Sequence, residues 1–102
     1  MAWKTVATTA EVAPGTAHVV EADGHRIAIC NTGDGFYTID DLCSHDGGPL
    51  GQGDLDGSQV ECPRHGARFD VATGKALCLP AVRPVKTYPT RVEGDSIAVD
   101  VT

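Results

Sequence analysis

Two short segments of this chain each carry one cysteine and one histidine. The pattern is C-x-H at residues 43–45 and C-x-x-H at residues 62–65, with sixteen residues between the two. In an extended stretch, residues two apart point to the same side, so Cys43 and His45 can serve one bound group together. Pro63 restricts the backbone of the second segment, which favours a tight turn. The pattern predicts two loops that hold one bound group between them.

The chemistry of these four side chains favours iron and sulfur over zinc. Thiolate is the soft ligand that iron–sulfur clusters need, and imidazole suits a more exposed iron. A [2Fe–2S] centre in which two histidines replace two cysteines on one iron is a Rieske centre. The alternative is a tetrahedral zinc site, but the usual zinc order places both cysteines first, whereas here the two residue types alternate. One cluster per chain is predicted, with ligands Cys43, His45, Cys62 and His65.

The segments around these residues resemble the soluble Rieske ferredoxins that supply electrons to bacterial aromatic-ring dioxygenases. The resemblance is carried by CSHDGGPL at 43–50, by CPRHGARFD at 62–70 and by CLPA at 78–81. It implies an all-β fold, a Rieske-type antiparallel β-sandwich or barrel, built as a single domain over residues 1–102. Within that domain, residues 41–83 would form a small cluster-binding subdomain. The resemblance also implies that Pro80 covers the cluster from a third side.

The chain departs from the respiratory branch of the same family. Respiratory Rieske proteins carry an extra cysteine in each ligand loop, at positions that correspond here to Leu50 or a near neighbour and to Arg64. They also carry serine and tyrosine where this chain has Ala67 and Phe69. Hydroxyl donors near a cluster favour its reduced form, and neither alanine nor phenylalanine can donate. The sequence therefore predicts a potential toward the low end of the Rieske range.

The resemblance implies an electron-transfer protein rather than an enzyme. The expected donor is a flavin-dependent ferredoxin reductase fed by NAD(P)H, and the expected acceptor is a terminal ring-hydroxylating oxygenase. An accessory Rieske subunit, such as the small subunit of a nitrite reductase, or a partner in cluster assembly, remains an alternative. A catalytic oxygenase subunit needs a second iron held by two histidines and a carboxylate, and His18 and His25 form no such triad.

Length and charge narrow the expected partners. A chain of 102 residues makes one domain. A net charge of −6 disfavours nucleic acid and suits docking on a basic protein surface, with Asp46 the nearest acidic residue to the cluster. The first residues show no signal-peptide pattern, and no apolar run is long enough to span a membrane. We therefore expect a cytoplasmic monomer without a membrane anchor.

Short β-rich segments separated by turn residues predict an antiparallel sandwich or barrel. Asp23-Gly24 indicates a hairpin, and residues 8–13 suggest one short helical turn. The expected strands are Trp3–Ala7, Ala17–Glu21, Arg26–Thr32, Phe36–Asp40, Gln59–Glu61, Arg68–Asp70, Lys75–Leu77, Val85–Val92 and Ile97–Val101.

Four residues outside the ligand set have expected roles. Cys30 and Cys78 sit in apolar surroundings and are interpreted as packing residues. Arg64 and Arg68 lie beside the ligands in the sequence. They would either orient a carboxylate of a partner protein or remain solvated.

Overall fold

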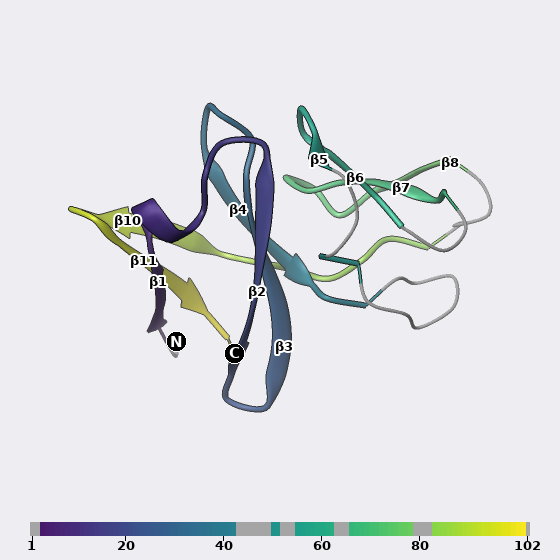
Figure 1. Ribbon diagram of the computed structural model, residues 1–102. Coiled ribbons are helices and arrows are strands. Elements are labelled where there is room, and N and C mark those ends of the chain that lie inside the picture. Colours follow the sequence, from purple (N-terminus) through teal and green to yellow (C-terminus); the bar gives the residue numbers. More distant parts are fainter. Residues whose placement is uncertain (1–2, 43–49, 52–54, 63–65, 79–82, 102) are drawn as a thin grey trace.

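The chain folds into three antiparallel sheets (Figure 1). The computed structural model describes residues 3–42, 50–51, 55–62, 66–78 and 83–101. Sheet A has the order β1-β11-β10, sheet B the order β2-β3-β4-β9, and sheet C the order β5-β6-β7-β8. A single 3-10 turn, η1 (Thr9–Glu11), follows the first strand. The all-β, antiparallel class expected from the sequence is confirmed.

The strands have the following bounds. Sheet A contains β1 (Trp3–Thr8), β10 (Thr90–Glu93) and β11 (Ser96–Asp100). Sheet B contains β2 (Thr16–Ala22), β3 (His25–Asn31), β4 (Phe36–Asp40) and β9 (Thr87–Tyr88). Sheet C contains β5 (Leu55–Asp56), β6 (Gln59–Glu61), β7 (Arg68–Asp70) and β8 (Ala76–Cys78). We refer to sheets A and B together as the base, and to the part that carries sheet C as the 41–83 subdomain.

Strand β3 is buried on both faces, and this places sheet B in the middle of the molecule. Ile27 and Ile29 pack toward sheet A, in clusters that contain Val99 and Ile97. Ala28 and Cys30 point the other way, because successive side chains of a strand alternate, and they join the cluster shared with the 41–83 subdomain. Figure 1 shows the result: sheet C lies on the opposite side of sheet B from sheet A.

One apolar cluster joins the 41–83 subdomain to the base. Ala28, Cys30 and Ile39 come from the base, and the remaining buried members are Leu50, Val60, Cys62, Ala67, Phe69, Val71 and Val85. Apart from Val85 and Cys62, which are 6% and 1% exposed, these residues have no exposed surface. Burial of apolar surface contributes about 25 cal/mol per Å². The subdomain is therefore held against the base by a shared apolar core.

The hairpin predicted at Asp23-Gly24 is confirmed. Both residues have positive φ, +50° and +80°, which matches the turn type that two-residue hairpins favour. Strands β2 and β3 pair on either side from Thr16↔Asn31 to Ala22↔His25. Residues 9–11 form the expected short helical turn.

The single strand expected over Val85–Val92 is wrong. The chain instead forms β9 in sheet B and β10 in sheet A, with Pro89 between them. Proline has no N–H to donate to a ladder, and here its carbonyl accepts from Asp100 N at 3.0 Å. Strand β5, which pairs with β6, was not predicted because it has two residues.

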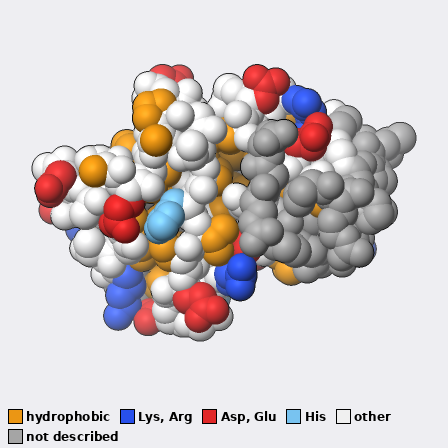
Figure 2. Space-filling view, viewed as in Figure 1, with side chains coloured by type: hydrophobic (Ala, Val, Ile, Leu, Met, Phe, Trp, Pro, Cys, Tyr) orange, Lys and Arg blue, Asp and Glu red, His pale blue; other side chains and the backbone are white. Residues whose placement is uncertain are grey.

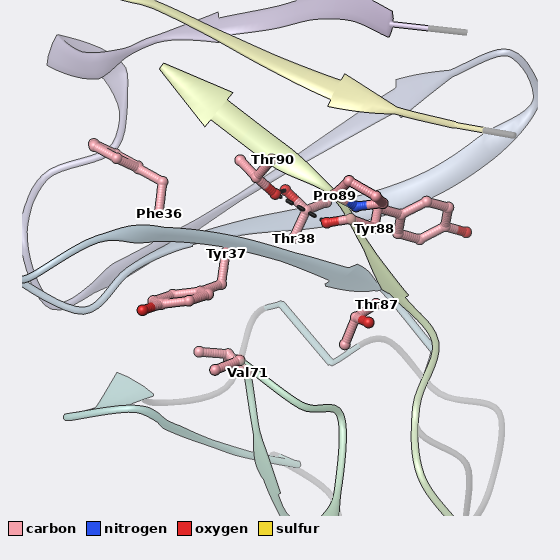
Figure 3. A pocket seen from close by; sticks show the side chains of 9 residues that line it. Phe36, Tyr37, Thr38, Val71, Thr87, Tyr88, Pro89 and Thr90 are labelled. Atoms are coloured by element: carbon pink, nitrogen blue, oxygen red, sulfur yellow. Dashed lines mark hydrogen bonds between the residues drawn. The ribbon is translucent and has the colours of Figure 1, made fainter. Parts of the chain in front are cut away.

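The crossing at Pro89 also ties the two sheets of the base together. Thr90 Oγ1 donates to Thr38 Oγ1 at 2.8 Å, which joins β10 to β4 (Figure 3). A hollow of about 310 Å³ opens beside this crossing, where β4 and β9 face the residues that follow β7. Tyr37 and Val71 line it from the base and from the 41–83 subdomain respectively.

Candidate metal centre

Of the four predicted ligands, Cys62 is the one that the structure describes, and its backbone forms hydrogen bonds to Gly66 and Ala67. It follows β6 directly and is 1% exposed. Its N–H donates to Ala67 O at 2.7 Å, and its carbonyl accepts from Gly66 N at 3.0 Å. These two bonds join the residues on either side of positions 63–65. The thiol is free and lies in the apolar cluster shared with the base, a setting that suits the inner, cysteine-ligated iron of a cluster.

The other three predicted ligands, Cys43, His45 and His65, lie outside the described residues. Among the residues that are described, no three His, Cys, Asp or Glu side chains gather in a way that would hold a metal ion. The ends of both ligand loops are described, however. Leu50, Cys62 and Ala67 belong to one apolar cluster, so both loops are anchored at the same place, as a centre held between two loops requires.

Asp41 fastens the residues that follow the first ligand loop. Its Oδ1 accepts from Leu50 N at 2.8 Å and from Gly51 N at 2.6 Å, and its Oδ2 accepts from Arg26 Nε at 2.7 Å. Burial alone would raise the pKa of Asp41, but the hydrogen bonds from Gly51, Arg26 and Leu50 outweigh it and hold that pKa below its usual value. Sequence analysis missed this residue because no local pattern links positions so far apart.

The two positions where respiratory Rieske proteins carry hydroxyl side chains, Ala67 and Phe69, are both fully buried here. Ala67 and Phe69 have no exposed surface and pack in the same cluster as Cys62. Neither side chain carries a donor. The expected consequence for the potential stays a prediction, and the burial shows that these two side chains are not in contact with bulk solvent.

Arg68 is held by side chains of its own sheet. Its Nη2 lies 3.1 Å from Glu61 Oε1 and its Nη1 lies 3.5 Å from Asp56 Oδ2. The guanidinium also donates to Gln59 Oε1 at 3.4 Å. The two roles expected for Arg68 were to orient a carboxylate of a partner protein or to remain solvated. Because its guanidinium already contacts side chains of its own sheet, the structure favours neither role. Arg64 lies outside the described residues.

Cys30 is a packing residue, as expected. It has no exposed surface, and burial raises the pKa of its thiol to about 12. Cys78 ends β8, and its side chain lies outside what the structure describes, as do Pro80 and Asp46. The remaining histidines lie in strands, and His25 packs its ring edge-on against Tyr88 at 5.9 Å between centroids.

On the face drawn in Figure 2, the described charges are dispersed. Figure 2 shows acidic and basic side chains scattered over this face, with apolar atoms between them, rather than gathered into one patch of a single sign. No helix in the described part of the chain has the length and apolar character of a membrane span.

Comparison with known proteins gives four consistent matches, two from sequence and two from solved structures. The model of the Rieske [2Fe-2S] domain family matches residues 2–89. The ferredoxin component of the naphthalene 1,2-dioxygenase system of Pseudomonas aeruginosa is 35% identical over 100 residues, which cover 98% of this chain and 96% of that protein.

Solved structures agree with these sequence matches. The ferredoxin of carbazole 1,9a-dioxygenase from Nocardioides aromaticivorans IC177 superposes with a TM-score of 0.92 at 38% identity, covering 97% of each chain. A second match, with a TM-score of 0.89 and 34% identity over 95% of this chain and 91% of the other, comes from a complex of reduced oxygenase and oxidized ferredoxin in carbazole 1,9a-dioxygenase.

Proposed function

Because this chain belongs to the Rieske [2Fe-2S] family, we propose that it is a one-electron carrier, the ferredoxin component of a ring-hydroxylating oxygenase system. The observation that carries the proposal is the full-length likeness to ferredoxin components in both sequence and fold. A Rieske cluster supplies reversible one-electron chemistry. The chain itself holds that centre and presents it to partners, and it is not the catalyst of oxygenation.

The proposed ligands are Cys43 and Cys62 on the inner iron and His45 and His65 on the outer iron. The burial of Cys62 and its backbone hydrogen bonds to Gly66 and Ala67 support the inner position of the cysteines. The purified protein should contain two irons and two acid-labile sulfides per chain, as a [2Fe–2S] centre requires, with the EPR signature of a Rieske centre after reduction. One zinc with no labile sulfide would contradict the proposal.

We place electron exchange at the edge formed by the two histidines. The proposed donor is a flavin-dependent ferredoxin reductase fed by NAD(P)H in the cytoplasm. The proposed acceptor is a terminal oxygenase, and the solved complex of a related ferredoxin with its oxygenase supports that partner. In a reconstituted system of reductase, carrier and oxygenase, product formation should depend on this chain and should saturate as its concentration rises.

The net charge of −6 is proposed to assist docking on a basic partner. Because the acidic side chains on the face drawn in Figure 2 form no single patch, Asp46, which follows His45 in the sequence, is the proposed local contributor. The rate of electron delivery should fall as salt rises, since screening shortens the Debye length to about 10 Å at 0.1 M. A rate of electron delivery that does not change from low to high salt would show that net charge does not contribute to docking.

A carrier exchanges partners, whereas an accessory subunit stays bound. We propose that this chain is a monomer that forms transient complexes. Size-exclusion chromatography of the chain alone, and then with oxygenase, distinguishes the two roles. A stoichiometric complex that survives dilution would favour the accessory-subunit alternative.

A further inference from the structure

One buried carboxylate lies between the base and both ends of the first ligand loop. Asp41 directly follows β4, and its N–H donates to Arg26 O at 3.0 Å, which extends the β3–β4 ladder by one residue. Its side chain has no exposed surface. In the sequence, Cys43 comes two residues later, and the segment that carries both loop ligands ends at Leu50, the first of the two residues whose N–H groups Asp41 Oδ1 accepts.

Gly51, the residue that follows that segment, is packed tightly against the base. A Cβ on Gly51 would lie 2.6 Å from Val19 Cγ2 and 2.9 Å from Ala28 Cβ, so its backbone is pressed directly against β2 and β3. Leu50 beside it has no exposed surface. The return point of the chain is thus fixed both by packing on sheet B and by the Asp41 carboxylate.

Although the Asp41 carboxylate is buried, the Arg26 side chain is about half exposed, so solvent screens their attraction and the ion pair adds little stability. The Arg26–Asp41 pair therefore calls for another role. We propose that Asp41 is a positioning residue for the first ligand loop: by holding Leu50 N and Gly51 N against the end of β4, it fixes the two ends of residues 43–49 at one place on the base.

Fixing both ends of the loop lowers the entropy that remains to be lost when Cys43 and His45 bind iron. Preorganisation of this kind strengthens binding without adding any contact to the bound group. The consequence is slower loss of the cluster and a defined ligand geometry. The inference rests on the proposed ligand set, in which Cys43 and His45 are ligands.

Three variants separate the effect of the Asp41 hydrogen bonds to Leu50 N and Gly51 N from the effect of the Arg26–Asp41 ion pair. Asp41→Ala removes all three contacts of the carboxylate. Asp41→Asn keeps an oxygen that can accept from both N–H groups, and Arg26→Gln keeps the carboxylate itself. Loss of the cluster to a chelator, followed by visible absorbance, should accelerate on the order of tenfold or more in Asp41→Ala, since hydrogen bonds to a charged group are strong. It should accelerate clearly less in the other two variants.

Two further measurements report on position rather than on stability. The EPR g-values of reduced Asp41→Ala should differ from wild type. In the cluster-loaded protein, the backbone amides of Leu50 and Gly51 should exchange with solvent faster in Asp41→Ala than in wild type.

Asn31→Ala is the matched control. Asn31 is also a buried side chain that fastens backbone: it donates to Val12 O at 2.8 Å and accepts from Gly33 N at 2.9 Å. It lies at the opposite end of the β3–β4 hairpin from Asp41. This variant should lower the melting temperature of the base without changing the g-values or the rate of cluster loss measured well below that temperature.

The outcomes are decisive in each direction. Cluster loss in Asp41→Ala that is no faster than in Asn31→Ala would overturn the inference, and so would equal acceleration in all three Asp41 and Arg26 variants. Cys43→Ser tests the ligand set separately. If Cys43→Ser keeps a normal cluster, the proposed ligands are wrong, whatever the Asp41 variants do.

Discussion

The base and the 41–83 subdomain are stabilised in different ways. In the base, β2 and β3 pair over seven residues each, and two apolar clusters lie between sheets A and B. In the subdomain, the four strands of sheet C have two or three residues each. Strands this short are not stable alone. The base therefore has strands and a core of its own, whereas the subdomain depends on its anchors and its bound centre.

The second anchor of the subdomain is a close backbone contact at Gly74. Gly74 O accepts from Val85 N at 2.8 Å, and Gly74 N donates to Asp70 O at 2.7 Å. Its φ is +78°, and a Cβ there would lie 2.2 Å from Val85 O. The turn between β7 and β8 is thereby fastened to the chain that enters β9. Together with Asp41, this contact holds the subdomain where the chain leaves the base and where it returns.

Removal of the cluster should give the largest difference between the two regions. Ligand binding and folding are coupled at such centres, so the apo-protein, or Cys62→Ser, should lose amide protection in β6 and β7 by at least about 100-fold. The amides of β2 and β3 should keep theirs. Hydrogen exchange resolved by residue measures both regions in one sample. Equal loss of protection in the base would show that the two regions fold as one unit.

Gly74→Ala should destabilise the protein by about 3 kcal/mol or more, because it combines a left-handed backbone with a clash against a carbonyl. Gly94→Ala is the control in the base: its φ is +62°, but nothing lies within 4 Å of the added carbon. It should cost about 1 kcal/mol. Denaturant unfolding gives both values. Similar costs would mean that close contact at Val85 does not anchor the subdomain.

Phe69→Tyr should have the smallest energetic effect and the most specific one. A hydroxyl added at this buried position can donate toward the centre and favour its reduced state. One such donor should raise the potential by roughly 50 mV, which corresponds to about 1.2 kcal/mol for a one-electron couple. Voltammetry measures the shift. Phe36→Tyr, a substitution in β4 of the base, should leave the potential unchanged, and a shift of the same size there would show that the effect is not local.

Much of this architecture was predictable because its signals are local. The Asp23-Gly24 turn requires positive φ at two adjacent residues, and that requirement selects residue types directly. The interleaved cysteines and histidines predict an iron–sulfur centre because a zinc site of the same residue types usually places both cysteines before the histidines. The burial of Cys30 follows from the apolar segment in which it sits. In each case, the chemistry is contained within a few consecutive residues.

The amino-acid sequence was therefore sufficient for the β class and the family, and the ligand set stays a prediction. The division of residues 87–93 between two sheets at Pro89 could not be read from the local sequence, because which ladder each half joins depends on strands distant in the chain. Only the tertiary structure decided that Asp41 fastens Leu50 and Gly51 while pairing with Arg26, fifteen residues earlier. A carboxylate next to a strand is an ordinary surface residue in sequence, and it acquires this role only when folding removes it from water and brings three donors to it.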